Sequence, residues 1–315
     1  MTKSNTLEKI YLASPRGFCA GVLRAVLILD SVLEKFGKPI YVCHQIVHNR
    51  TVVGNFKKKG VVFIEDINDI PDKSYVVFSA HGVPPQFYEV AKNKKLNVFD
   101  ATCPLVNKVH LEVKRYVKEG YYILYIGHKN HPEPIGVLGE VSSASSVLID
   151  SLKKAKLIRP PQTERLIILN QTTLSMDDTK KNITLLKKRF SKIILPPSSD
   201  ICFSTQNRQN AVKKLAKKVK IVLVIGSKES SNSNRLREAA EKEGAKAYLI
   251  DGVKDVKKEW LKNVKSVGIT AGASAPNNII DDVVKFLRTK NTIVKEIETV
   301  KENIRFPFDL KLLQK

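Results

Sequence analysis

The amino-acid sequence predicts an α/β protein made of three similar units, each with a mostly parallel sheet covered by helices. Three observations support this prediction: a cysteine heads three helix-like stretches, strand-like runs follow at matching distances, and polar residues come directly after each run. Fixed spacings of this kind are typical of repeated structural units. Apolar, β-branched strands that alternate with helices favour parallel sheets buried on both faces.

The first element of each unit is a helix that begins at or near Cys19, Cys103 or Cys202. Apolar residues recur at helical spacing in all three stretches, which cover residues 20–37, 104–120 and 203–220. Pro104 fits the first turn of its helix, where a missing N–H group is no loss.

A strand-like run follows each helix and ends in polar residues. These first runs are 39–42, 121–127 and 220–226. The polar residues His48, His131 and Ser231 come 29, 28 and 29 residues after their cysteines. Second runs follow at 62–66, 147–150 and 248–251, and third runs at 75–80, 166–170 and 266–270. The first two units then return through residues 97–100 and 192–195 toward the next cysteine.

The cysteine spacing divides the chain into three segments, residues 1–102, 103–201 and 202–315, the last with a C-terminal tail. In parallel α/β sheets the ligand binds beyond the carboxyl ends of the strands. The polar residues follow those ends. If the units close around a pseudo-threefold axis, we expect the three cysteines and the polar loops to face one central cavity.

Composition sets the protein class. The 315 residues are 43% hydrophobic, which is ample for a buried core, and no apolar run approaches the roughly 18 residues of a membrane span. The N-terminal residues "MTKSNTLEK" show no apolar secretory signal. Four cysteines in so long a chain do not form a disulfide framework, so we expect a reducing cytoplasm.

The charge balance is strongly basic, with 54 Lys and Arg against 31 Asp and Glu and a net charge of +23. The lysines are scattered and aromatics make up only 7% of the chain, so no basic stripe with stacking residues is visible. We interpret most of the excess as solvated helix faces and expect neither nucleic acid nor membrane as a partner. A second interpretation is attraction of an acidic partner or an anionic ligand.

Three equivalent cysteines at helix starts suggest a metal centre, because a helix N-terminus favours the thiolate. Zinc held by three Cys and one His is possible, but structural zinc usually takes closely spaced ligand pairs, and the chain has no C-x-x-C. An iron–sulfur cluster fits better, since four irons held by three thiolates leave one iron open. Cys43 lies outside the repeat, within a strand-like run, and we interpret it as structural.

The polar loops offer donors that suit a phosphorylated anion. These candidates are His48, His81, Ser230, Ser231, Asn232 and Ser274. Glu133, two residues after His131, is a candidate proton donor held beside a metal-bound substrate.

The chain also resembles the 4-hydroxy-3-methylbut-2-enyl diphosphate reductase family from about residue 10 to residue 310. The resemblance lies in these motifs: "RGFCAGVLRA", "HNR", "FSAHGV", "FDATCPLVNKVH", "GHKNHPE", "QTTLSMDDT", "DICFSTQNRQ", "GSKESSNSNRL" and "TAGASAP". It implies a trefoil of three α/β domains around a [4Fe–4S] cluster with one open iron site. It also implies reductive removal of the substrate's hydroxyl group with two electrons and two protons. The products would be isopentenyl and dimethylallyl diphosphates, in the last step of the non-mevalonate isoprenoid pathway.

Residue roles follow from the same resemblance. Cys19, Cys103 and Cys202 match the cluster ligands. The diphosphate would be held by His48, His81, Ser230, Ser231, Asn232 and Ser274. His131 and Thr172 would contact the substrate, and Glu133 would donate protons. Departures from the family pattern, at Leu23, Cys43, Gln45 and Asn277, fall on none of these residues.

Two alternatives stay open at this point. One is an iron–sulfur hydratase or dehydratase that acts on a phosphorylated substrate without net redox change. The other is an iron–sulfur regulatory protein that binds nucleic acid through its lysines, although no helix-turn-helix or other nucleic-acid signature is present. For the reductase, the excess positive charge predicts an acidic electron donor of the flavodoxin or ferredoxin type.

Overall fold

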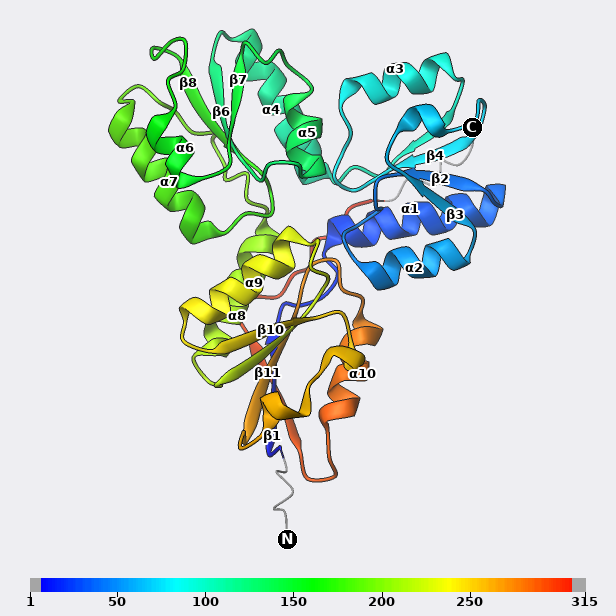
Figure 1. Cartoon of the computed structure of the whole chain (residues 1–315), viewed down its shortest axis with the longest axis vertical. Helices are drawn as coiled ribbons and strands as arrows, with labels where there is room; N and C mark the ends of the chain where they lie inside the picture. The colour runs from blue at the N-terminus through cyan, green and yellow to red at the C-terminus, as the bar shows by residue number, and fades with distance from the viewer. Residues whose placement is uncertain (1–6, 308–315) are drawn as a thin grey trace. The chain divides into compact units, whose positions relative to one another are not determined.

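The computed structural model describes residues 7–307, whose strands form three parallel sheets, A, B and C (Figure 1). Residues 1–6 of the stretch considered for a targeting signal, and residues 308–315 of the predicted tail, lie outside the described residues. Within residues 7–307 no helix is long and apolar enough to cross a membrane.

Sheet B contains four strands in the order β3-β2-β4-β5. The strands are β2 (Ile40–Cys43), β3 (Val61–Ile64), β4 (Tyr75–Phe78) and β5 (Asn97–Asp100). The associated helices are α1 (Ala20–Phe36), α2 (Arg50–Lys58), the short 3₁₀ helix η1 (Ile67–Asp69) and α3 (Pro85–Asn93). Residues from α3 and η1 pack with Phe78 of β4 in one apolar core. Tyr75 of the same strand stacks on Phe36 of α1, with ring centroids 4.4 Å apart.

Sheet C contains three strands in the order β7-β6-β8. The strands are β6 (Tyr122–Ile126), β7 (Ser146–Ile149) and β8 (Leu166–Asn170). Its helices are α4 (Pro104–Lys118), α5 (Pro132–Leu138), α6 (Leu152–Leu157) and α7 (Met176–Arg189). Residues of α4 and α5 pack on one face, and residues of α6 and α7 pack on the other.

The expected return strand at residues 192–195 is reduced to one parallel bridge between Ile194 and Ile167. Pro196 and Pro197 follow directly in the sequence. Because proline has no N–H group to donate, a strand cannot continue through them as an interior ladder.

Sheet A contains five strands in the order β10-β9-β11-β1-β12. The strands are β1 (Lys9–Ser14), β9 (Ile221–Ile225), β10 (Lys246–Ile250), β11 (Ser266–Ala271) and β12 (Ile293–Glu298). The helices are α8 (Phe203–Ala216), α9 (Ser231–Lys242) and α10 (Asn277–Leu287), with two 3₁₀ turns, η2 (Val253–Asp255) and η3 (Lys258–Leu261).

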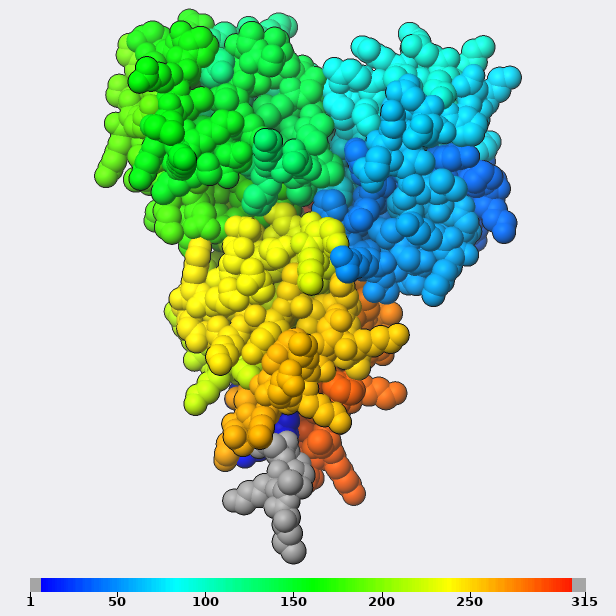
Figure 2. Space-filling view, viewed as in Figure 1, coloured from blue at the N-terminus to red at the C-terminus, as the bar shows by residue number. Residues whose placement is uncertain are grey.

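The central strands β9 and β11 of sheet A are buried on both faces, as expected for a parallel sheet. Val222 and Val224 of β9 pack in the core that contains residues of α8 and α9, whereas Leu223 and Ile225 pack in the core that contains α10. Figure 1 shows α10 on the side of the sheet opposite to α8 and α9. In Figure 2 the side chains fill the space between these ribbons. The predicted fold class, an α/β protein with three parallel sheets, is confirmed.

The strand β1 joins a sheet that the predicted segments did not assign to it. It pairs with β11 on one side and β12 on the other, so residues 9–14 lie in the sheet of the C-terminal segment. Hydrogen bonds between strands depend on tertiary arrangement and not on nearness in the sequence, which is why the repeat did not reveal this pairing. The predicted boundaries 1–102, 103–201 and 202–315 otherwise stay a prediction.

The chain divides into two compact units, which we describe separately. The sheet A unit contains the residues up to Ala20, His48–Gly54 and Phe203–Ile304. The sheet BC unit contains Gly21–Val47, Asn55–Cys202 and the residues from Arg305 onward.

Candidate active site

Each of the three repeated cysteines is the residue directly before a helix. Cys19 precedes α1, Cys103 is the N-cap residue of α4, and Cys202 precedes α8. Their backbone N–H groups donate to carbonyl oxygens in the loops that follow β11, β4 and β8. The acceptors are Ala273 for Cys19 (3.1 Å), Ala80 for Cys103 (3.0 Å) and Thr172 for Cys202 (3.0 Å). The sequence repeat therefore corresponds to a repeated local geometry.

Cys43 differs from the other three cysteines in its burial. It ends β2 with an exposed fraction of 0%, whereas Cys19, Cys103 and Cys202 are partly exposed. Burial, with a smaller effect of the nearby Asp66 and Glu65 charges, raises the pKa of the Cys43 thiol to about 12. A thiol that stays protonated is a poor metal ligand, since metals bind the thiolate.

The candidate metal ligands are distributed over both units. Cys19 belongs to the sheet A unit, and Cys103 and Cys202 belong to the sheet BC unit. Among residues 7–307 no group of three or more His, Cys, Asp or Glu side chains is placed closely enough to hold a metal ion. What the chain supplies is the donor set: three partly exposed thiols, each at the start of a helix of at least 14 residues.

In the sheet A unit, polar residues gather where β9 and β11 end and α9 begins. Ser230 is the N-cap of α9, and its hydroxyl accepts from the N–H group of Ser233. Asn232, in the first turn, is only 4% exposed, yet neither polar atom of its side-chain amide has a hydrogen-bond partner within residues 7–307. An unsatisfied buried amide is costly, so its presence points to a ligand.

The loops that contain His48 and Ser274 lie together in the same unit. The Ser274 hydroxyl donates to the backbone carbonyl of His48 at 2.9 Å. His48 precedes α2, and Ser274 follows β11. The sheet A unit thus contains Cys19 and the predicted diphosphate ligands His48, Ser230, Ser231, Asn232 and Ser274.

In the sheet BC unit, Glu133 is a buried acid bound to Thr172. It is 1% exposed and lies in the first turn of α5. Its Oε1 accepts from the Thr172 backbone N–H at 2.6 Å, and its Oε2 accepts from the Thr172 hydroxyl at 3.0 Å. Burial raises the pKa of Glu133 to about 7, although the two Thr172 hydrogen bonds oppose the shift. At neutral pH a substantial fraction of this carboxyl is protonated.

Two histidines accompany Glu133 in this unit. The Nδ1 atom of His131, the N-cap of α5, accepts from the Glu133 backbone N–H at 3.1 Å. The His131 ring contacts that of His81 edge to face, with centroids 5.7 Å apart. Ser79 Oγ lies 3.3 Å from His81 Nδ1. The predicted residues His81, His131, Glu133 and Thr172 are therefore brought together with Cys103 and Cys202 in one compact unit.

The sequence analysis did not select Asp200, a buried acid two residues before Cys202. Its side chain is 0% exposed, its Oδ1 lies 3.0 Å from Lys108 Nζ, and its Oδ2 accepts from the Asn170 N–H at 2.9 Å. Burial raises the pKa of Asp200 to about 7, and its charge contributes in turn to the raised pKa of Glu133. Asp200 opens the motif "DICFSTQNRQ", but a single acid ahead of a cysteine carries no sign of burial.

The fold and the site together define an α/β protein with three cysteine-led helices, a buried amide at the start of α9 and a buried acid on α5. The family model described as "LytB protein" matches residues 10–288, and the chain belongs to this family.

Curated relatives match nearly the whole chain. The 4-hydroxy-3-methylbut-2-enyl diphosphate reductase of Polaromonas sp. is 47% identical over 97% of this chain and 92% of its own length. The enzyme of the same name from Aeromonas salmonicida is 48% identical, over 96% of this chain and 99% of its own length.

Solved structures agree. The E-1-hydroxy-2-methyl-but-2-enyl-4-diphosphate reductase from Plasmodium falciparum has a TM-score of 0.94 and 39% identity, covering 98% of this chain and 97% of that one. A second structure is described as (E)-4-hydroxy-3-methyl-but-2-enyl diphosphate reductase, the terminal enzyme of the non-mevalonate pathway. It has a TM-score of 0.64 and 34% identity, covering 89% of this chain and 98% of that one. The predicted family and the prediction of an oxidoreductase are confirmed.

Proposed function

We propose that this chain catalyses the reductive dehydroxylation of 4-hydroxy-3-methylbut-2-enyl diphosphate to isopentenyl diphosphate and dimethylallyl diphosphate. The similarity to curated reductases, at 47–48% identity over 96–97% of the chain, carries this proposal. The names of those relatives favour it over the alternative, an iron–sulfur hydratase or dehydratase without net redox change.

Cys19, Cys103 and Cys202 would hold a [4Fe–4S] cluster with one open iron site. The donor set fits, since these thiols are partly exposed at helix starts and Cys43 is buried with a raised pKa. When bound, the cluster would supply electrons and an open coordination position for the hydroxyl end of the substrate. Cys43 takes no part.

The diphosphate would bind at the start of α9, where backbone N–H groups and the helix dipole favour an anion. The Asn232 amide would donate to a phosphate oxygen, which would satisfy a buried group that has no partner among the described residues. Ser230, Ser231, Ser274 and His48 would add donors from the same unit, and the family resemblance makes His81 a further proposed donor. Neutral donors allow the site to hold a charged group without a rigid ion pair.

Glu133 would donate a proton that lets the hydroxyl group leave as water. Glu133 Oε2 lies 3.0 Å from the Thr172 hydroxyl oxygen, so a protonated Glu133 could donate to that hydroxyl while the hydroxyl passes its own proton to the substrate. His131 accepts at Nδ1 from the Glu133 backbone, so in its neutral form it carries its proton on Nε2 and can donate to the substrate there.

The electron donor would be an acidic flavodoxin- or ferredoxin-type protein, drawn by the net charge of +23. We keep the cytoplasm as the proposed location. Neither nucleic acid nor a membrane is part of this proposal.

The test is turnover of the diphosphate substrate by anaerobically purified protein with and without a reductant. We expect both diphosphate products only when the reductant is present, together with a change in the visible spectrum on substrate addition. Conversion without any reductant would favour the hydratase or dehydratase, and no conversion with an intact cluster would overturn both.

A further inference from the structure

A cation on each cysteine-led helix contacts the backbone segment in front of the next cysteine. The helix α1 follows Cys19, and its Arg24, five residues on, donates from Nη1 to the Thr102 carbonyl at 3.1 Å. Thr102 directly precedes Cys103. The link therefore runs from the helix of one cysteine to the peptide that orients the next.

The same relation recurs one step along the chain. The helix α4 follows Cys103, and its Lys108, again five residues on, lies 3.0 Å from the Asp200 carboxylate. Asp200 is two residues before Cys202, and its other oxygen accepts from the Asn170 backbone at 2.9 Å. Lys108 thus connects the segment before Cys202 to α4, and Asp200 itself connects this segment to the end of β8.

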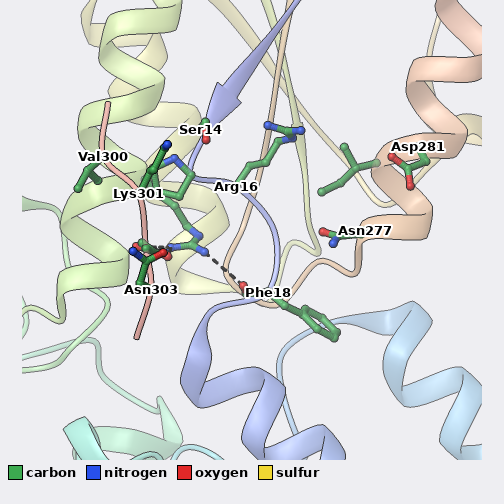
Figure 3. A pocket seen from close by; sticks show the side chains of 12 residues that line it. Ser14, Arg16, Phe18, Asn277, Asp281, Val300, Lys301 and Asn303 are labelled. Atoms are coloured by element: carbon green, nitrogen blue, oxygen red, sulfur yellow. Dashed lines mark hydrogen bonds and ion pairs between the residues drawn. The ribbon is translucent and has the colours of Figure 1, made fainter. Parts of the chain in front are cut away.

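The third link returns from the last cysteine to the first. The helix α8 follows Cys202, and its Arg208, six residues on, donates from Nε and Nη2 to the Gly17 carbonyl at 3.1 and 2.9 Å. It also reaches the Phe18 carbonyl at 3.4 Å, and a dashed line in Figure 3 marks a bond to Phe18. Gly17 and Phe18 directly precede Cys19.

Arg208 is the most buried of the three cations. It is 1% exposed, and its charge is paired with Glu302, whose two carboxylate oxygens lie 3.1 and 3.0 Å from Nη1. The pair borders a cavity of about 470 Å³, drawn in Figure 3 with Lys301 and Asn303 beside it. A buried guanidinium with one carboxylate partner and three carbonyl partners, Gly17, Phe18 and Ser204, holds its acceptors in a narrow range of positions.

The turn that Arg208 contacts contains a glycine that a larger residue cannot replace without displacement. Gly17 has a φ of +71°, and a Cβ added there would lie 2.9 Å from Asn277 Oδ1. The other side of the turn is fixed by hydrogen bonds from the Gly17 and Cys19 N–H groups to Ala271 and Ala273. Hydrogen bonds therefore hold the backbone before Cys19 on both sides.

We propose that Arg24, Lys108 and Arg208 form a cyclic set of positioning residues. Each is carried on the helix of one cysteine and sets the direction of the next thiol: Arg24 for Cys103, Lys108 for Cys202 and Arg208 for Cys19. This deepens the proposed function, because it rests on the three cysteines acting together as ligands. The arrangement links each ligand position to its neighbour, so that the loss of one cation loosens one named cysteine.

The test uses the full-length protein and hydrogen–deuterium exchange of the three peptides that contain the cysteines. We expect Arg208→Met to speed exchange about tenfold around Cys19, Arg24→Met around Cys103, and Lys108→Met around Cys202, each leaving the other two peptides unchanged. Arg189→Met is the matched control, since Arg189 donates to the carbonyls of Ala155 and Ile158, far from any cysteine in the sequence. It should change none of the three peptides.

A second measurement follows the loss of visible absorbance from the anaerobic holoprotein in the presence of an iron chelator. Each of the three variants should lose absorbance several-fold faster than wild type, and Arg189→Met should match wild type. If Arg208→Met does not fold, Arg208→Lys keeps the positive charge but lacks the planar guanidinium with its several N–H donors. It should speed exchange around Cys19 selectively, but less than Arg208→Met. The other two cations are less buried and test the pattern independently.

The outcomes separate this inference from the proposed function. Equal exchange in all variants, or acceleration of all three peptides by each variant, overturns the cyclic assignment even if the cluster is present. Retention of the cluster in Cys103→Ser overturns the ligand assignment, whatever the exchange pattern shows.

Discussion

The two compact units prepare different chemistry with the same α/β construction. In the sheet A unit the residues predicted to hold the diphosphate include hydroxyls and a buried amide at the first turn of α9. In the sheet BC unit the corresponding loops hold a buried carboxyl with a pKa raised to about 7, flanked by histidines and a threonine. One unit is suited to binding an anion, and the other to storing a proton.

The difference shows that the strand–helix topology sets the position of functional groups, whereas their surroundings set their chemical properties. In both units the groups follow parallel strands and precede helices. The Asn232 amide has no hydrogen-bond partner in the described part of the chain, so it favours an incoming acceptor. Glu133 is surrounded by protein and near the charge of Asp200, so it favours its neutral form. Substitutions that affect one unit and spare the other test this division.

The largest expected effect is on the proposed iron–sulfur cluster. Cys19→Ser, Cys103→Ser and Cys202→Ser should each lose most bound iron and sulfide after anaerobic reconstitution, because each removes one of three thiolates. Cys43→Ser is the matched control and should keep the cluster, since Cys43 is buried in the core of sheet B. Cluster loss confined to the Cys43 variant would reverse the assignment.

The next largest effect concerns Glu133, the proposed proton donor. Glu133→Gln keeps shape and hydrogen bonding but cannot give up a proton, so turnover should fall by about 10²-fold or more. Iron content and substrate affinity should stay near wild type. Near-normal turnover with an intact visible spectrum would mean that the proton comes from another group. The assignment of proton donation to Glu133 would then be wrong.

A smaller effect is expected in the anion-binding unit. Asn232→Ala removes a donor to the diphosphate, so KM should rise about tenfold while kcat changes little, in keeping with the loss of one hydrogen bond to a charged group. Asn182→Ala on α7, whose amide donates to the Asp178 carbonyl, serves as a control with unchanged KM. A fall in kcat with constant KM would place Asn232 with the proton-handling groups instead.

The pH dependence sharpens the role of Glu133. Its pKa of about 7 means that kcat should fall about fivefold between pH 7 and pH 8 as the acid deprotonates, and the residual rate of Glu133→Gln should not show this fall. The folded-state pKa is raised above the ordinary value of 4.5, so the contribution of Glu133 to stability is full below about pH 4.5. It is lost as pH rises through about 7, a change of at most about 3 kcal/mol. Urea unfolding at pH 5 and pH 8 should show a smaller loss for the Gln variant than for wild type.

The smallest expected effect concerns electron delivery. Turnover with an acidic protein donor should fall a few-fold between about 0.05 and 0.3 M salt, because attraction between exposed charges is screened beyond a Debye length of about 10 Å at 0.1 M. Turnover with a small neutral reductant should change less. If turnover falls equally with salt for both donors, the net charge of +23 has no role in recruiting the protein donor.

The sequence by itself determined the repeated elements of this protein. Helical periodicity after Cys19, Cys103 and Cys202, and apolar runs at matching offsets, are local properties, and the structure has helices and parallel strands at those positions. Periodicity records which residues of one element face inward, so it predicts elements and strand ends well. The motif resemblance then identified the family.

Only the tertiary structure decided which distant segments meet. It placed β1 between β11 and β12, buried Cys43 completely and left the Asn232 amide without a hydrogen bond to any described residue. It also raised the pKa of Glu133, which depends on burial and on Asp200, 67 residues later in the chain. Strand pairing, desolvation and electrostatic coupling are set by neighbours in space, and a pattern along one element does not contain them.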